Sequence, residues 1–406
     1  MRILIAAENA SYRFGGEAVL PLHYFARLRK RGIEAWMVVH SRTRQELIDL
    51  FPDDKDRLFF TADTWAHRTL FRLSRFLPRR VSEMSIGLLM QLLTQYEQQR
   101  FIRQLVSEKK VDVVHQSIPV SPRFPSLLSN VGAPVVIGPM NGGMDYPPGF
   151  RNEESAFSRI AVALGRRLSG MVHSVLSGKK QASILLVANE RTRKALPFSP
   201  RNPVIELVEN GVDLDLWSAS EAAASSRERP RFLFMGRLVD WKAVDLALEA
   251  LTKVPGAELE IIGNGPMLEI WQGLAKDLGL SGRVQFSGFQ PQKECALRLR
   301  SATALLLPSL YECGGAVVLE AMAAGVPVIA TNWGGPADYL DATCGVLIDP
   351  TDRAAIVQGF AAAMTRLMED PDTARQMGAR GRIRVEELFD WDKKIDRILE
   401  IYEQAL

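Results

Sequence analysis

The fold is indicated by the stretch RFLFMGRLVDWK, residues 231–242, in which an apolar run passes directly into glycine, arginine and lysine. Residues 232–235 are all apolar, so we expect 231–235 to be a strand buried on both faces. A helical pattern follows at 243–253, and this order of strand, loop and helix recurs along the chain. The sequence therefore predicts parallel, doubly wound α/β sheets.

The second half continues this alternation. Its remaining helices are expected at 266–278, 292–301 and 315–324, and its remaining strands at 204–208, 258–262, 284–286, 304–307, 326–330 and near Val346. The first half shows the same pattern more loosely. Helices are expected there at 17–31, within 66–110 and at 156–181, and strands at 3–7, 34–40, 111–115, 134–138 and 184–188.

The length predicts two domains, because 406 residues exceed the ~250–300 that one hydrophobic core organises. A Ser-Pro-Arg-Asn-Pro segment at 199–203 suits a hinge, so we place the domains at 1–200 and 204–390. The final helix, about 391–406, is expected to pack back on the first domain. Ligands of such sheets lie beyond the carboxyl ends of the strands, here in a cleft between the domains.

The composition excludes several classes of protein. Hydrophobic residues make up 47% and charged residues 24%, as in globular proteins, and the net charge of +3 gives no reason to expect nucleic acid binding. The three cysteines, Cys295, Cys313 and Cys344, have neither disulfide-framework nor metal-ligand spacing, which favours a cytoplasmic protein. No apolar run is long enough to predict a spanning helix.

Two cations follow the strand at 231–235. Arg237 suits a bidentate contact with phosphate and Lys242 a point-charge contact, so together they fit a diphosphate. The alternative is an ordinary solvated helix start.

Two acidic residues flank a glycine pair after the strand at 304–307. Gly314 and Gly315 open a helix whose bare N–H groups could receive an anion. Glu312 precedes this helix and Glu320 lies within it, and carboxylates accept hydrogen bonds from sugar hydroxyls. The alternative is a helix cap at Glu312 and a solvent-facing Glu320. Gly263, directly after the strand at 258–262, fits ligand contact or a tight turn equally.

These motifs resemble, in order, those of family 4 retaining glycosyltransferases of the GT-B fold, also called glycosyl transferases group 1. The resemblance covers about 204–390 and implies two Rossmann-like domains facing across a cleft. The motifs are Glu312-x7-Glu320, the Gly-Arg-Leu-x-x-x-Lys run at 236–242, Asn-Gly-Val-Asp at 210–213 and Gly-Val-Pro-Val-Ile at 325–329.

The resemblance assigns a role to each donor-site residue. Arg237 and Lys242 would bind the diphosphate of a nucleotide sugar, and Glu320 the ribose hydroxyls. Glu312 would contact the transferred hexose, beside the amides of Gly314 and Gly315. Gly15 and Gly16 would approach the phosphates from the N-terminal loop, and Gly263 would border the base.

The first half departs from the family pattern at one place. Many relatives carry His-x-His after the fourth strand of the N-terminal domain, whereas this chain has His115 followed by Gln116 and Ser117. A catalytic and a core role for His115 therefore both stay open. In the loop at 138–146, Asn141 and Gly142 would shape an acceptor pocket or make a tight turn.

The implied activity is retaining transfer of a hexose from a nucleotide-diphosphate sugar to a hydroxyl acceptor, in bacterial polysaccharide or glycolipid synthesis. The diphosphate serves as the base, so the resemblance implies no cofactor and no metal. The alternatives are a nucleotide-sugar epimerase, with His115 and Glu312 as its acid/base groups, and a non-catalytic sugar-nucleotide-binding protein.

Basic residues interrupt apolar ones in 67–81 and 159–180. Such helices bind anionic membrane surfaces. The acceptor would then be lipid-linked and not a free sugar, and the protein would lie peripherally on the inner face of the membrane. The alternative is a solvated helix face.

Overall fold

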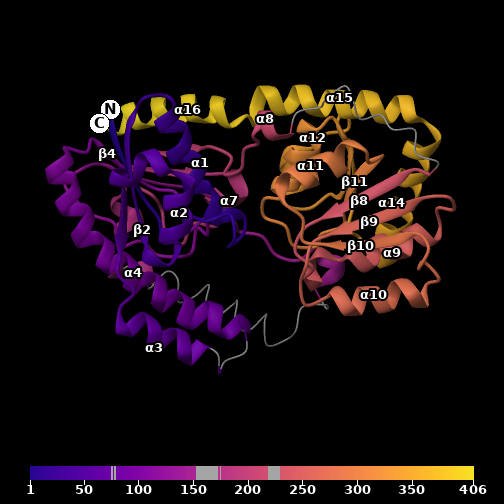
Figure 1. Ribbon diagram of the computed structural model, residues 1–406, viewed down its shortest axis with the longest axis horizontal. Helices are drawn as coiled ribbons and strands as arrows, with labels where there is room; N and C mark the ends of the chain where they lie inside the picture. The colour runs from indigo at the N-terminus through magenta and orange to yellow at the C-terminus, as the bar shows by residue number, and fades with distance from the viewer. Residues whose placement is uncertain (75, 77–78, 152–171, 174, 218–228) are drawn as a thin grey trace. The chain divides into compact units, whose positions relative to one another are not determined.

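The computed structural model describes residues 1–74, 76, 79–151, 172–173, 175–217 and 229–406, with the backbone alone at 79–85. The described chain forms two compact units, each built on one sheet (Figure 1). The first contains Met1–Gly143, the described part of 155–209 and Lys394–Leu406, and the second contains the described part of 144–154 and Asn210–Lys393.

The first sheet has seven parallel strands in the order β3-β2-β1-β4-β5-β6-β7. The side chains of Ile3, Leu4 and Ile5 in β1 are fully buried, because the central strand is covered on both faces. The strands are β1 (Arg2–Ala6), β2 (Glu34–His40), β3 (Leu58–Thr61), β4 (Val113–Gln116), β5 (Val135–Met140), β6 (Ile184–Val187) and β7 (Val204–Glu206).

Helices follow most of these strands. They are α1 (Gly16–Lys30), α2 (Arg44–Leu50), α3 (Trp65–Ser74), α4 (Arg79–Lys109), α6 (Gly178–Gln181) and α7 (Glu190–Lys194). The rest of the helix expected at 156–181 lies mostly outside the described residues, as do the cations Arg159, Arg166 and Arg167.

The second sheet has six parallel strands in the order β10-β9-β8-β11-β12-β13. They are β8 (Arg231–Met235), β9 (Glu258–Ile262), β10 (Val284–Gly288), β11 (Ala304–Leu307), β12 (Val328–Thr331) and β13 (Gly345–Ile348). The helices around it are α8 (Leu214–Trp217), α9 (Val244–Thr252), α10 (Leu268–Asp277), α11 (Gln292–Arg300), α12 (Ala316–Ala323), α13 (Gly335–Tyr339), α14 (Arg353–Glu369) and α15 (Pro371–Leu388). Doubly wound parallel sheets in both halves are thus confirmed.

Strand β7 belongs to the first sheet, although we expected it in the second. We assigned residues 204–208 to the second domain, but β7 pairs with β6 in the first sheet, Leu185 lying opposite Val204. Because of that pairing, the chain leaves the first unit after Glu209 and not at 199–203.

The last helix, α16 (Trp391–Ala405), joins the first unit from Lys394 onward. Its apolar face is fully buried at Ile395, Ile398 and Ile401. Asp396 pairs with Arg31 at the end of α1. Within the described part of the chain, every helix is too short or too polar to span a lipid bilayer.

Candidate functional site

The order in which strands are added to the second sheet reverses between the neighbouring strands β8 and β11. From β8, the strands that come next in sequence, β9 and β10, lie on one side, and β11 to β13 lie on the other. Ligands of open α/β sheets bind beyond the carboxyl ends of the strands at such a point. The loops that start there are 236–242, after β8, and 308–315, after β11.

The loop after β8 holds its two cations differently. Leu238 and Val239 are buried, which anchors the loop on the core and leaves the Arg237 side chain exposed. Lys242 ends a short 3₁₀ turn, Asp240–Lys242, and only 15% of its side chain is exposed. Within the described chain Arg237 makes no ion pair, so its charge is available to a ligand.

Lys242 and Glu312 are in contact. The Lys242 ammonium pairs with the Glu312 carboxylate, and the Leu310 amide donates to the Trp241 carbonyl at 2.9 Å. These contacts tie the two loops together across the switch point. We expected Lys242 to serve the diphosphate and Glu312 the hexose. Their pairing instead leaves Arg237 as the cation of the two that no carboxylate balances within the described residues.

The glycine pair shapes the start of α12. Gly315 has φ +87° and precedes the first residue of the helix. A Cβ on Gly335 would lie 1.8 Å from the Gly314 carbonyl oxygen, so the loops before α12 and α13 approach more closely than side chains allow. The Gly335 amide donates to the Glu312 carbonyl at 2.8 Å. The helix start therefore stands beside the Lys242–Glu312 pair, with backbone N–H groups suited to an anion.

Glu320 is a partly buried carboxyl on α12, between the buried side chains of Leu319 and Ala321. Burial raises its pKa to about 7. No hydrogen bond or ion pair to Glu320 forms within the described chain, so its oxygens keep their capacity to accept hydrogen bonds from hydroxyls. This arrangement agrees better with a hydroxyl-binding role than with a freely solvated carboxylate.

Gly263 serves the packing of the loops themselves. Its φ is +137°, and a Cβ would lie 1.9 Å from the carbonyl oxygen of Gly236. The Leu238 amide donates to the Asn264 carbonyl at 2.9 Å, which holds the loop after β9 against the loop after β8. The tight-turn interpretation accounts for this glycine without a ligand.

Gly15 and Gly16 lie at the start of α1, in the loop that follows β1. Gly15 has φ +108°, and nothing lies within 4 Å of an ideal Cβ on either residue. Both are exposed, so the first N–H groups of this 15-residue helix are accessible.

His115 is a fully buried histidine on β4. Its Nε2 lies 2.6 Å from the Gly138 carbonyl oxygen, its Nδ1 lies 2.7 Å from the Tyr402 hydroxyl, and the Tyr24 ring meets it edge-on. Burial lowers its pKa to about 4, so the ring is neutral at physiological pH. Both nitrogens are thus engaged within the protein, which agrees with a core histidine and not with a proton-transferring one.

Asn141 and Gly142 are tied to α7. The Gly142 amide donates to the Thr192 hydroxyl at 3.1 Å, and that hydroxyl lies 3.4 Å from Oδ1 of Asn141. Both residues are buried. The tight-turn interpretation of the predicted acceptor residues therefore accounts for their contacts.

The residues that follow this turn contact loops of the second sheet, and the sequence did not predict these contacts. Trp333 Nε1 donates to the Asp145 carbonyl at 2.8 Å, and the rings of Tyr146 and Tyr311 lie 5.7 Å apart. The segment from Met144 thus supports the loop that carries Glu312. Two tyrosines far apart in the sequence gave no local sign of this contact.

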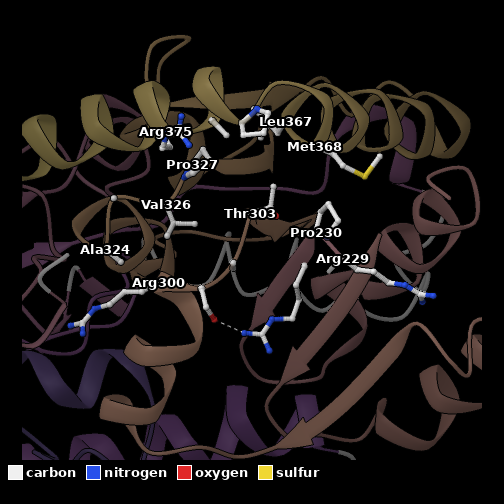
Figure 2. A pocket seen from close by; sticks show the side chains of 16 residues that line it. Arg229, Pro230, Arg300, Thr303, Ala324, Val326, Pro327, Leu367, Met368 and Arg375 are labelled. Carbon is white, nitrogen blue, oxygen red and sulfur yellow. Dashed lines mark hydrogen bonds between the residues drawn. The ribbon is translucent and has the colours of Figure 1, made fainter. Parts of the chain in front are cut away.

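A cavity of about 360 Å³ lies at the amino-terminal ends of the strands of the second sheet (Figure 2). It is lined by residues that precede β8, β11 and β12, including Pro230, Thr303 and Pro327. The labelled arginines Arg229, Arg300 and Arg375 point away from one another in Figure 2. Their charges do not converge on one ligand, and ligands of such sheets bind at the carboxyl ends, so this cavity is a poor candidate for the nucleotide.

Three residues of the first unit have the composition of a metal site. The ligand atoms of His40, Asp63 and His67 lie within 4.8 Å of one another. His40 Nδ1 accepts from the Arg42 amide at 3.2 Å, which places the proton of the neutral ring on Nε2, toward Asp63 at 3.7 Å. His40 Nε2 has no hydrogen-bond partner among the described residues, but both ring nitrogens of His67 already contact threonine hydroxyls, so His67 has no nitrogen left for a metal ion.

Comparison with known proteins shows what the second half of the chain resembles. Residues 217–384 match the family model "Glycosyl transferases group 1". A GDP-mannose-dependent alpha-(1-6)-phosphatidylinositol monomannoside mannosyltransferase of Mycolicibacterium smegmatis is 34% identical over 230 residues, covering 52% of this chain and 59% of that protein. A glycogen synthase of Mycobacterium tuberculosis is 32% identical over 244 residues, covering 58% of each. The chain thus spans less than two thirds of these relatives.

The structural neighbours extend over both units. The Anabaena protein HepE, solved with UDP, superposes with a TM-score of 0.68 at 16% identity, and the match covers 100% of both chains. At that identity the likeness concerns the fold. Residues 217–384 thus match glycosyl transferases group 1, and the chain has the GT-B fold of two Rossmann-like units.

Proposed function

We propose that this protein is a retaining hexosyltransferase that uses a nucleotide-diphosphate sugar and no metal. One observation carries the proposal: exposed Arg237, the Lys242–Glu312 pair and the glycine-opened start of α12 gather at the switch point of the second sheet. A diphosphate meets positive charge and free N–H groups there. Glu320, on the same helix, is available to the ribose hydroxyls.

The proposed reaction needs no protein nucleophile. The bond between the anomeric carbon and the diphosphate oxygen breaks, and the acceptor oxygen bonds to that carbon on the same face. The departing diphosphate keeps the bonding electron pair and takes the acceptor's proton. The protein positions the two substrates and stabilises the negative charge that grows on the leaving group, which is the task of Arg237, Lys242 and the amides of Gly314 and Gly315.

The experiment that tests this function follows the donor by NMR. The full chain is incubated with UDP- and GDP-hexoses, with and without sugar and glycolipid acceptors, after chelation of metal ions. We expect a product of unchanged anomeric configuration that forms only with acceptor. An epimerised donor would support an epimerase, and binding without any product a non-catalytic sugar-nucleotide-binding protein. Inversion, or loss of turnover on chelation, would contradict the proposed mechanism.

Glu320→Ala should weaken nucleotide binding. Hydrogen bonds to a charged group contribute ~1.5–3 kcal/mol each, so we expect the Kd of the preferred nucleotide to rise ~10-fold or more. Calorimetry of the full chain with UDP and with GDP measures it. Glu269→Ala, at an exposed position on α10, is the matched control and should bind as the wild type does. Equal affinities of both variants would remove the ribose role.

The pH dependence of stability reports the same carboxyl independently. Because burial raises the pKa of Glu320 from 4.5 to about 7, the folded protein favours its protonated form. The contribution of Glu320 to the free energy of unfolding is therefore fully present below the ordinary carboxyl pKa, and it is lost as the pH rises through 7. Glu320→Gln should therefore lose less stability than the wild type between pH 5 and 8 in urea unfolding.

We further propose that helix α3 binds an anionic lipid surface. On α3 the side chains of Trp65 and Phe71 are 75% and 54% exposed, and Arg68 and Arg72 are also exposed. Phe76, two residues after the helix ends, is 84% exposed. The other side of the helix rests on α4, where His67 Nε2 lies 3.1 Å from the Thr94 hydroxyl. Aromatic side chains among cations suit the boundary of an anionic bilayer, each cation contributing about 1 kcal/mol.

Sedimentation with vesicles tests the role of α3. The wild type should sediment with vesicles of phosphatidylglycerol and phosphatidylcholine at low salt, and much less with phosphatidylcholine alone. Trp65→Ser with Phe76→Ser should lower the bound fraction several-fold. Ile270→Ser, at a position 60% exposed on α10, is the control. Binding that survives the double substitution would exclude α3 as the contact.

A further inference from the structure

A second cavity lies in the first unit, at the switch point of the first sheet. Strands β1 and β4 are neighbours there, with β2 and β3 on one side and β5 to β7 on the other. The cavity measures about 270 Å³ and is lined by Glu8 and Asn9 after β1, by Ile118 and Pro119 after β4, and by residues of α1 and α4. Its size, just below the ~300 Å³ of small ligand pockets, suits a single ring.

Two polar side chains in the cavity wall have hydrogen-bonding capacity that no described residue uses. Gln91 on α4 is only 5% exposed, and its amide makes no hydrogen bond within the described chain. Oδ1 of Asn9 is buried and also has no partner among the described residues. Buried polar groups are otherwise nearly always hydrogen-bonded, so these two are suited to a ligand that offers hydroxyls.

The charge of the cavity wall is negative. Glu8 and Glu17 are its charged residues, and no lysine or arginine lines it within the described chain. Arg42 lies 3.7 Å from Glu8 outside the lining, and Glu17 accepts from the Val120 amide at 3.2 Å. The carboxylates accept hydrogen bonds from hydroxyls, but they repel a phosphate brought within a few ångströms. Exposed Phe14 adds an apolar wall.

We propose that this cavity binds the acceptor through an uncharged, hydroxyl-bearing ring and discriminates against rings that carry a phosphate. The inference rests on the proposed function, since it names the acceptor class of the same enzyme. It assigns acceptor selection to Glu8, Glu17 and Gln91, in place of the Asn141–Gly142 turn.

Matched pairs of probes test the discrimination. The full chain is titrated by saturation-transfer NMR with methyl α-mannoside against mannose 6-phosphate, and with myo-inositol against inositol 1-phosphate. We expect the neutral member of at least one pair to bind ~10-fold or more tightly than its phosphorylated partner. Equal or tighter binding of the phosphorylated members, or no binding of either neutral probe at ~100 mM, would overturn the proposal.

Isosteric substitution connects the discrimination to the cavity. Glu17→Gln keeps an oxygen for the Val120 amide but removes the negative charge, so the preference for the neutral probe should fall several-fold. Glu34→Gln is the control, because Glu34 is exposed at the amino-terminal end of β2 and does not line the cavity. An unchanged preference in Glu17→Gln would refute the role of this carboxylate.

Nucleotide affinity measured on the same samples separates the two proposals. If the chain binds nucleotide but does not discriminate between probes, the cavity inference fails and the transferase proposal stands. If it discriminates but binds no nucleotide, the transferase proposal fails.

Discussion

Arg237→Ala should lower the rate of sugar transfer by ~10²-fold or more while leaving the fold intact, because it removes a preorganised cation from the leaving group. The exposed Arg237 guanidinium makes no ion pair within the described chain, so the substitution breaks no contact of the folded protein. Comparison of kcat and KM for the wild type and the variant measures the effect. The loss should fall mainly on kcat, because the negative charge is greatest in the transition state.

A second arginine of the same sheet is the matched control. The Arg229 side chain is 57% exposed and precedes β8, so it lies at the opposite end of that strand from Arg237. Arg229→Ala should therefore keep turnover within a few-fold of the wild type. If Arg237→Ala does the same, the diphosphate does not bind at the end of β8 and the transferase assignment is wrong.

Lys242→Ala should be as damaging for a different reason. Lys242 balances Glu312, so its removal leaves a carboxylate unpaired beside the diphosphate as well as removing a cation. Adding Glu312→Gln to Lys242→Ala should therefore recover part of the lost nucleotide affinity. This recovery would not occur if Lys242 and Glu312 acted on separate parts of the donor.

The sequence predicts the strands of these sheets well where they are buried on both faces. The expected strands 231–235, 258–262 and 304–307 agree in their bounds with β8, β9 and β11. A central strand of a parallel sheet is apolar without alternation, and this pattern ends where the loop begins. Strand β3 lies at the edge of the first sheet, where two of its four residues are only partly buried, and it was missed.

The sheet to which a strand belongs, and the partners of each candidate site residue, depend on contacts between residues far apart in the sequence. The sequence around β7 does not show that it pairs with β6. His115 is held by Tyr402, 287 residues further along the chain, and Lys242 pairs with Glu312, 70 residues away. The sequence predicted that the donor-site residues follow strands, but it could not show that two of them neutralise each other.

One buried charge cluster should dominate the stability of the second unit. Glu260 on β9 is fully buried and pairs with Arg231, 2.5 Å away on β8, and with Arg298 on α11. Ser287 donates to the same carboxylate at 2.7 Å. Because the Arg231 side chain is only 8% exposed, water cannot replace Glu260 as its partner. Local sequence does not show this role, because the two arginines that Glu260 meets lie 29 and 38 residues away along the chain.

Glu260→Ala should lower the free energy of unfolding of the second unit by ~3–5 kcal/mol, because it leaves Arg231 buried without its counter-ion. Hydrogen exchange of the amides of β8 and β9, which open with the core of the unit, measures the loss. Glu386→Ala removes a half-exposed pair with Arg382 within one helix and should cost only ~0.3–0.5 kcal/mol. Equal protection in the two variants would mean that desolvation of the Glu260 cluster cancels its attraction, so that the cluster contributes specificity to the fold and no net stability.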